Sequence, residues 1–262
     1  MDLGIDGRAC VVTGASRGIG RATARLLAAE GASVLLVGRS ADALAAAATD
    51  CGGRGSTLVA DLRDPDAGDA VVAACVERFG RVDALVNNAG VIHVAPIDEL
   101  TDADWQEQWE INVMAPMRLM RAAAPRMAER GWGRVVNVSS SSGKRPSQRN
   151  AAYSVTKAAE LSLSRTFADA WAGEGVLVNA VAPGLTATGM WLDPGGLADQ
   201  EAARQGVDRD ELIASLDGRT PRGRVADDEE IAAVIAFLCS ERAANVVGAA
   251  WSVDGGSVPT IL

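Results

Sequence analysis

The chain has 262 residues, of which 48% are hydrophobic, so it has enough apolar material for a sizeable buried core and is not a disordered chain. Its formal net charge of −9 argues against a nucleic-acid partner, because binding to phosphates requires a basic patch. No apolar run approaches the ~20 residues of a membrane span, and the N-terminus lacks the basic and apolar segments of a secretory signal.

The cysteines bear on the compartment and on metal binding. Four of them are scattered along the chain, at Cys10, Cys51, Cys75 and Cys239, and no pair has the C-x-x-C spacing. This pattern suggests neither a disulfide framework nor a metal site. Because reduced thiols are typical of the cytoplasm, we expect a cytoplasmic protein without a bound metal ion.

A glycine-rich loop follows the first predicted strand. Residues 8–14 form a short β-branched run, and residues 21–30 place alanines and leucines at helical spacing. Glycines between a strand and a helix let the backbone approach a pyrophosphate, and the helix N-terminus supplies N–H donors. We therefore predict a dinucleotide cradle in this loop. Its candidate residues are Gly14, Ser16, Arg17, Gly18, Ile19 and Gly20.

The tip of the second predicted strand indicates which dinucleotide binds. Residues 33–37 form this strand, and Gly38-Arg39-Ser40 follows at the place that faces the adenosine ribose in dinucleotide folds. An acidic residue there would favour NAD, whereas a guanidinium suits a 2′-phosphate. Arg17 is a second candidate cation. NADP(H) is therefore favoured, the alternative being that both arginines only line a solvated edge.

Strands and helices alternate along the rest of the chain. Further strands are predicted at residues 56–60, 84–86, 134–138, 176–181 and 251–253. Helices are predicted at residues 41–48, 66–79, 101–112, 114–130, 151–172 and 227–240. This alternation predicts an α/β fold: a single-domain, Rossmann-like, doubly wound parallel sheet with helices on both faces, formed by residues 1–262.

Polar side chains stand where these strands end or where a helix is interrupted. Asp61, followed by Leu62, ends the third strand and either bonds an adenine amino group or is an ordinary turn carboxylate. The turn Asn87-Asn88-Ala89-Gly90 ends the fourth strand, and its asparagines are expected to satisfy backbone groups across neighbouring strands. Asn112 lies in an apolar helical stretch, where a break in the helix would offer a place for an ordered water.

The stretch from Ser140 to Lys157 carries the predicted chemistry. Tyr153 and Lys157 are four residues apart, so on a helix they lie on the same face. An ammonium beside a phenol lowers the tyrosine pKa from ~10 toward neutrality, which makes the hydroxyl a general acid or base. Ser140 ends the apolar run before this helix and can hold a carbonyl oxygen in the same pocket. Taken alone, a Tyr-x-x-x-Lys pair is more often a helix-surface contact.

The connection at residues 185–226 is too long for a turn, and we predict a partly helical lid there. Met190-Trp191-Leu192 opens the lid and either closes an apolar wall over the ligand or anchors the lid. His93, the only histidine, faces either the substrate or solvent. We expect a medium-sized, largely apolar ketone, cyclic ketones included, or its alcohol. The candidate substrate residues are His93, Ser142, Met190 and Trp191.

Together these motifs resemble the short-chain dehydrogenase/reductase family over residues 8–256, which is nearly the whole chain. The residues that carry the resemblance are Thr13-Gly14-x-x-x-Gly18-x-Gly20, Asp61, Asn87-Asn88-Ala89-Gly90, Asn112, Ser140, Tyr153-x-x-x-Lys157, Pro183-Gly184 and Asp254-Gly255-Gly256. The resemblance implies that Tyr153 donates a proton to the carbonyl oxygen and that Ser140 holds this oxygen. It also implies that Lys157 bonds the nicotinamide ribose and that Asn112 holds a water in a proton relay.

The resemblance further implies the cofactor contacts and the assembly. Besides the cradle residues, the implied contacts are Arg39, Asp61, Leu62, Asn88, Ala89, Gly90, Tyr153, Lys157, Pro183, Gly184, Thr186 and Thr188. Among them, Thr188 would contact the nicotinamide or pyrophosphate side of the cofactor. A homotetramer built from the long helices and the C-terminal strand is implied, or else a homodimer.

Alternatives to a ketone reductase remain open at this point. The segment at residues 185–226 is longer than is usual in the family, so analogy is weakest where selectivity is decided. Relatives that act on acyl carrier proteins carry a basic residue just before the sixth strand, where this acidic chain has Glu174; a 3-oxoacyl thioester reductase is therefore the weaker alternative. A cofactor-binding regulator without activity would be expected to lack Tyr153 or Lys157, and a sugar-nucleotide epimerase would need a larger C-terminal region.

Overall fold

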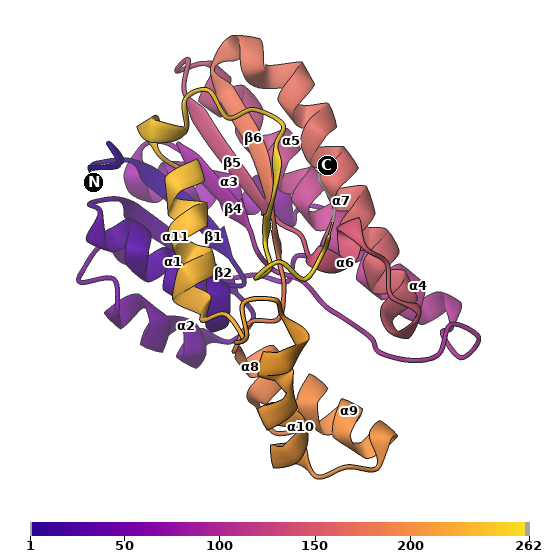
Figure 1. The fold of residues 1–262 in the computed structure, drawn as a ribbon. Helices are drawn as coiled ribbons and strands as arrows, with labels where there is room; N and C mark the ends of the chain where they lie inside the picture. Colours follow the sequence, from indigo (N-terminus) through magenta and orange to yellow (C-terminus); the bar gives the residue numbers. More distant parts are fainter. Residues whose placement is uncertain (1, 260–262) are drawn as a thin grey trace.

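The computed structural model of the protein describes residues 2–259. Seven parallel strands form one sheet in the order β3-β2-β1-β4-β5-β6-β7 (Figure 1). The strands are β1 (Ala9–Thr13), β2 (Ser33–Gly38), β3 (Gly55–Val59), β4 (Ala84–Asn87), β5 (Gly133–Val138), β6 (Val176–Pro183) and β7 (Ala250–Val253). The predicted doubly wound parallel sheet is confirmed.

Helices cover both faces of the sheet. The main ones are α1 (Gly18–Ala29), α2 (Ala41–Thr49), α3 (Ala67–Phe79), α4 (Asp102–Trp109), α5 (Ala115–Ala128), α7 (Ala151–Trp171) and α11 (Asp228–Leu238). Helices α1, α2 and α11 pack on one face and α3, α5 and α7 on the other (Figure 1). Within residues 2–259, no helix combines the length and the hydropathy that crossing a bilayer requires.

The central strands are apolar on both sides because both sides are covered. In β1, Cys10 and Val12 point into the core under α1, whereas Val11 points into the core under α3. Successive side chains of a strand alternate between the faces, so a sheet covered twice needs a continuous apolar run. This is why the run at residues 8–14 predicts a buried strand rather than an edge strand.

The order of the strands creates a crevice at one edge of the sheet. Strand β1 lies between β2 and β4. The chain first adds β2 and β3 on one side of β1 and then crosses to the other side, where it adds β4 to β7. Ligands of open α/β sheets bind at such a reversal, outside the carboxyl ends of the strands. The glycine loop after β1 and the turn after β4 therefore meet at one place.

Three local features differ from the predictions. Helix α1 begins at Gly18, three residues earlier than predicted, because the end of the glycine loop already forms its first turn. Helix α4 ends at Trp109 rather than at residue 112, and the interruption predicted at Asn112 takes the form of a π-helical segment, Glu110–Met114, that leads into α5. A four-residue helix, α6 (Ser141–Lys144), was missed because its side chains carry no periodic apolar pattern.

The connection after β6 is partly helical, as predicted. It contains α8 (Gly189–Leu192), α9 (Leu197–Gln205), α10 (Arg209–Leu216) and a 3₁₀ turn (Asp217–Arg219). In Figure 1 these orange helices extend away from the body of the sheet. Ala198, Ala202 and Leu212 form a small buried cluster of their own, and Trp191 packs against it. The function of this segment as a lid stays a prediction.

Candidate active site

A cavity of about 440 Å³ opens at the carboxyl edge of the sheet. Its walls come from the loops after β1 to β6 and from α8 and α9, segments that are far apart in the sequence. Most of the predicted site residues line this cavity. They are Gly14, Ser16, Arg17, Gly18, Ile19, Arg39, Asp61, Leu62, Asn88, Ala89, Gly90, Ser140, Ser142, Tyr153, Lys157, Pro183, Gly184, Thr186, Thr188, Met190 and Trp191.

The glycine loop has the shape of a phosphate cradle. Gly14 and Gly18 have positive φ angles of 62° and 52°, which other residues adopt only with strain. Gly20 does not line the cavity. A Cβ atom on Gly20 would lie 2.4 Å from the Gly14 carbonyl oxygen and 2.4 Å from Asn88 Nδ2, so only glycine allows this close approach. Gly20 thus acts by closing the loop.

The first turn of α1 is suited to an anion. Its N-cap residue, Arg17, makes no side-chain capping hydrogen bond with any of the described residues. The N–H groups of a helix N-terminus and the helix dipole favour a negative charge at this point. The residues at this end of the cavity therefore fit the pyrophosphate of a dinucleotide.

The turn after β4 joins three strands. Asn88 donates from Nδ2 to the carbonyl oxygens of Thr13, at 2.9 Å, and Gly14, at 3.2 Å, and so connects β4 with β1. Asn87 donates from Nδ2 to Asn137 Oδ1 at 2.7 Å and connects β4 with β5. The predicted bridging of neighbouring strands is confirmed, although Asn87 meets a side chain rather than the backbone.

Charged groups gather at the end of the cavity near β2 and β3. Asp61 accepts hydrogen bonds from Arg63 Nη2 at 2.5 Å and from the Arg63 backbone N–H at 3.0 Å. These bonds, with the Arg63 side chain contributing most, hold the pKa of Asp61 at about 2. Arg39 lines the same end, while Arg17 donates to Asp193 Oδ2 at 2.9 Å across to the segment after α8.

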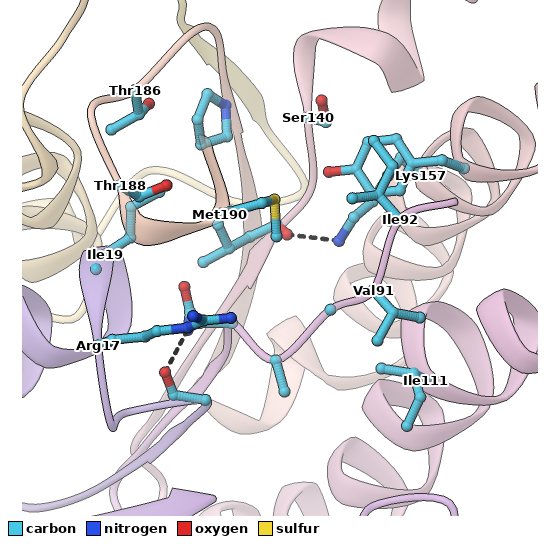
Figure 2. Close-up of a pocket in the computed structure, with 18 of the residues that line it drawn as sticks. Arg17, Ile19, Val91, Ile92, Ile111, Ser140, Lys157, Thr186, Thr188 and Met190 are labelled. Atoms are coloured by element: carbon cyan, nitrogen blue, oxygen red, sulfur yellow. Dashed lines mark hydrogen bonds between the residues drawn. The ribbon is translucent and has the colours of Figure 1, made fainter. Parts of the chain in front are cut away.

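Tyr153 and Lys157 project from the first turns of α7, and both line the cavity. The Lys157 ammonium lies 5.8 Å from the centre of the Tyr153 ring. It donates to the Val138 carbonyl oxygen at 2.9 Å and to Glu160 Oε2 at 2.8 Å. In Figure 2, Lys157 and Ser140 lie on one side of the cavity, and Arg17 and Ile19 lie on the other.

Ser140 is held by the helix that the sequence did not reveal. It is the N-cap of α6, and its Oγ accepts a hydrogen bond from the Ser142 backbone N–H at 3.1 Å. Gly143 permits α6 to lie against α7, because a Cβ at Gly143 would come within 2.8 Å of the Lys157 backbone. The short helix thus places the serine hydroxyl at the cavity wall beside the tyrosine helix.

Asn112 supports the site from behind the cavity wall. It lies in the π-helical segment, so the predicted break in the helix is present. The side chain is fully buried: Nδ2 donates to the Val91 carbonyl oxygen at 2.9 Å and to Thr156 Oγ1 at 3.0 Å. Its Oδ1 accepts from the Val91 backbone N–H at 3.0 Å. Asn112 therefore fixes the loop after β4 against α7.

Four polar side chains, His93 among them, differ from the prediction of which residues line the cavity. His93 does not line the cavity; its Nε2 lies 2.8 Å from Glu107 Oε2, and Glu107 does line it. Arg63 and Asn150 also line the cavity and were missed. The sequence contains one indication that Arg63 belongs to the site, since it is a cation two residues after Asp61 at the end of a strand. No sequence pattern indicates Glu107 or Asn150. Within residues 2–259, no group of three or more His, Cys, Asp or Glu side chains is arranged to hold a metal ion.

Comparison with known proteins identifies the family. A family model described as short chain dehydrogenase matches residues 8–194. The chain belongs to the short-chain dehydrogenase family. The predicted resemblance is thereby confirmed, and the cradle, the Tyr153–Lys157 pair and Ser140 all lie within the matched residues.

Other members of the short-chain dehydrogenase family are similar over almost their whole length. Cis-4-hydroxycyclohexanecarboxylate dehydrogenase of Sinomonas cyclohexanicum is 40% identical over 252 residues, which cover 95% of this chain and 96% of that protein. Galactitol 2-dehydrogenase (L-tagatose-forming) of Cereibacter sphaeroides is 39% identical over 256 residues, with coverages of 96% and 95%. The crystal structure of L-sorbose reductase from Gluconobacter frateurii, complexed with NADPH and L-sorbose, has a TM-score of 0.93, 39% identity and full coverage of both chains.

Proposed function

We propose that the protein is an NADP(H)-dependent oxidoreductase that interconverts a ketone and a secondary alcohol. One observation carries the proposal: Tyr153, Lys157 and Ser140 line the same cavity as the glycine cradle. A proton donor and a dinucleotide site are thus combined in one crevice. The ketone and alcohol dehydrogenases among the relatives support the reaction class.

Different residues of the chain bind the reactants and transfer the proton. When bound, the dinucleotide supplies or accepts the hydride. Tyr153 gives its hydroxyl proton to the carbonyl oxygen in reduction and takes it back in oxidation. Ser140 donates a hydrogen bond to the same oxygen and so orients the carbonyl. Lys157 places a positive charge beside the phenol and a hydrogen-bond donor at the ribose. Asn112 holds the loop after β4 in place against α7.

We propose NADP(H) rather than NAD(H) because Arg39 follows β2 and lines the cavity without an acidic neighbour at the strand tip. Arg17 is the second candidate, although it is paired with Asp193 here. The NADPH complex of L-sorbose reductase supports the same choice. A guanidinium meets a 2′-phosphate with charge-assisted hydrogen bonds that NADH cannot make.

Replacing Arg39 with Ala is expected to weaken NADPH binding by roughly 10- to 100-fold and to leave NADH binding almost unchanged, because only the phosphate contact is lost. Fluorescence titration with both nucleotides measures this. Arg78→Ala, an exposed arginine on α3 outside the cavity, is the matched control. Equal losses for both nucleotides, or wild-type preference for NADH, would contradict the assignment.

The proposed substrate is a medium-sized ketone with a largely apolar body, cyclic ketones included. Apolar side chains form part of the cavity wall: Val91, Ile92, Met190, Trp191 and Leu197. Ser142 and Asn150 add polar groups for one or two substrate oxygens. A relative that acts on a hydroxylated cyclohexane ring supports this reading. We propose that α8 to α10 form the lid, with Trp191 facing the ligand.

Replacing Trp191 with Ala is expected to raise KM for apolar cyclic ketones by about tenfold, because part of a buried aromatic contact is lost. The affinity for NADPH serves as the control within the same variant and should change little, because Trp191 is not one of the residues of the glycine cradle. Steady-state kinetics with a series of ketones of increasing size measures the effect. An unchanged KM for every ketone would show that Trp191 only anchors the lid.

Assaying the purified protein against a panel of ketones and alcohols, with NADPH and with NADH, tests the proposed function directly. The panel includes a 3-oxoacyl thioester, and preferred turnover of that compound would favour the carrier-protein alternative over ketone reduction. Absence of turnover with every carbonyl compound, despite tight NADPH binding, would favour a regulator instead.

We also propose that the protein is a cytoplasmic homotetramer. Large apolar side chains are exposed on the elements expected to form the contacts: Trp109 on α4 is 38% exposed, Val155 on α7 48% and Trp251 on β7 37%. Burying such residues between copies removes apolar area from water. The four cysteines are free and buried, which suits a reducing compartment. Light scattering coupled to size-exclusion chromatography distinguishes a tetramer from a dimer.

A further inference from the structure

A buried carboxylate lies against the cavity lysine, and none of the roles described above uses it. Glu160 is three residues after Lys157 on α7, and its Oε2 accepts a hydrogen bond from Lys157 Nζ at 2.8 Å. The two side chains are only 1% and 3% exposed. A charge taken out of water is costly unless it is paired, so a glutamate at this place needs a reason.

The geometry around the ammonium indicates what Glu160 does. A lysine ammonium has three N–H donors. Glu160 takes one and the carbonyl oxygen of Val138, at 2.9 Å, takes a second. One donor is left, and Lys157 lines the cavity. Two fixed acceptors therefore hold the nitrogen in place, so that the third N–H is available to a ligand in the cavity.

The pair also decides the charge of the lysine. Burial by itself lowers the pKa of Lys157, but the negative charge of Glu160, followed by that of Tyr153, opposes this effect and raises the pKa above its usual value. Burial raises the pKa of Glu160 to about 7, and the Lys157 ammonium opposes that rise. Without the carboxylate, desolvation of the lysine would be opposed only by the more distant phenol and by the hydrogen bond to the Val138 carbonyl oxygen.

No second charged group replaces Glu160 in this role among the described residues. Charged side chains on the elements packed against α7 are engaged elsewhere: Glu110 pairs with Arg118 at 3.0 Å, and Glu107 lies against His93. On α6, Lys144 donates to the carbonyl oxygen of Ala250 and to Ser252. The remaining charged side chains of these elements lie on their exposed sides or at the far end of β5. They are Asp102, Asp104, Arg121, Arg126, Arg134 and Glu174, while Arg149, in the turn before α7, pairs with Glu201.

The buried polar side chains nearest to the pair carry no charge. Ser164 donates to the Glu160 carbonyl oxygen at 2.7 Å and accepts from Asn137 Nδ2 at 2.8 Å, and Asn137 is in turn bonded to Asn87. This chain of hydrogen bonds runs from α7 into the centre of the sheet. It fixes the turn of α7 that carries Glu160, so the carboxylate has little freedom to move away from the lysine.

We infer that Glu160 is a positioning residue that keeps Lys157 protonated and aims its free N–H into the cavity. The consequence for catalysis rests on the proposed function: a neutral lysine would no longer favour the phenolate that alcohol oxidation requires. Reduction, which starts from the protonated phenol, depends less on this charge. Glu160 would thus set the pH range over which the protein oxidises alcohols.

The chain is well suited to a direct test, because Lys144 and Lys157 are its only lysines. Labelling lysine side chains with carbon-13 at Cε gives two NMR signals, and Lys144→Arg assigns them. In the wild-type protein, Lys157 is expected to remain an ammonium up to or beyond the usual lysine range of ~10.4. In Glu160→Gln, an isosteric change that leaves an acceptor but no charge, Lys157 is expected to lose its proton at lower pH.

Asp83→Asn is the matched control. Asp83 is a fully buried carboxylate paired with Arg81 at 2.5 Å, outside the cavity, so its loss should lower stability without altering the titration of Lys157. The same Lys157 titration in wild type and Glu160→Gln would overturn the inference. If Glu160→Gln does not fold, the titration of Lys157 in the wild-type protein still tests the inference. Loss of the Lys157 proton at a pH well below the usual lysine range would show that the Glu160 carboxylate does not keep the lysine protonated.

A kinetic measurement separates this inference from the proposed function. In Glu160→Gln, alcohol oxidation near neutral pH is expected to fall on the order of tenfold and to recover at higher pH, while Asp83→Asn keeps the wild-type pH profile. If wild type oxidises no alcohol and reduces no ketone, the proposed function fails, and the NMR result on Lys157 stands independently. If wild type is active but the profile of Glu160→Gln does not move, only the role of Glu160 fails.

Discussion

Replacing Tyr153 with Phe is expected to lower turnover by about 10²- to 10⁴-fold in both directions while leaving NADPH binding nearly unchanged, because general acid–base catalysis typically contributes this much. Tyr153 is the single tyrosine of the chain, and its ring lies 5.8 Å from the lysine ammonium at the cavity wall. Phenylalanine keeps the ring and its packing but has no proton to give. The loss should therefore appear in kcat rather than in the affinity for the nucleotide.

Two measurements on the same preparation make this result decisive. Single-turnover reduction of a ketone reports the chemical step, and fluorescence titration with NADPH reports binding. Ser162→Ala, an exposed position on the same helix outside the cavity, should match the wild type in both. Turnover within a few-fold of wild type in the Phe variant would contradict the proposed proton donor, and with it the reading of this cavity as an oxidoreductase site.

Replacing Gly20 with Ala is expected to abolish measurable NADPH binding and to lower the free energy of unfolding by roughly 1–3 kcal/mol, the usual range for overpacking. The added methyl group would meet the Gly14 carbonyl oxygen and Asn88 Nδ2, each at 2.4 Å. Neither neighbour is a flexible chain end: one is backbone, and the other is held by two hydrogen bonds to β1 and the loop. The loop itself must move, and the cradle moves with it.

Gly173→Ala is the matched control, because a Cβ there has no heavy atom within 4 Å and the residue has no positive φ. This change should alter the free energy of unfolding by no more than about 0.5 kcal/mol and leave NADPH binding intact. Denaturant unfolding and nucleotide titration of both variants provide the comparison. A Gly20→Ala protein that binds NADPH as wild type would show that the close approach of loop and Asn88 is not needed for the cradle.

Most secondary-structure elements of this protein could be predicted from the sequence because they depend on local patterns. The run before Gly14 is short and uninterrupted, as a strand buried on both faces must be, and the run before Ser139 is interrupted only by Asn137. Helix α4 begins within one residue of the predicted start, because the capping box formed by Thr101 and Asp104 needs only two side chains three residues apart. The spacing of Tyr153 and Lys157 likewise follows from the geometry of one helix.

The tertiary structure decided which side chains share the cavity and what state they are in. Glu160 has the i,i+3 spacing to Lys157, but only the packing of α7 on the sheet makes that contact a buried ion pair rather than a surface one. The ring of His93 is turned to Glu107 by the course of a loop, which carries no periodic signal. By itself, the sequence determined the order of the elements and the motifs at their ends, because these are encoded by neighbouring residues. The partners of each polar group and its exposure to water were decided by the fold, because the groups involved come from segments far apart in the chain.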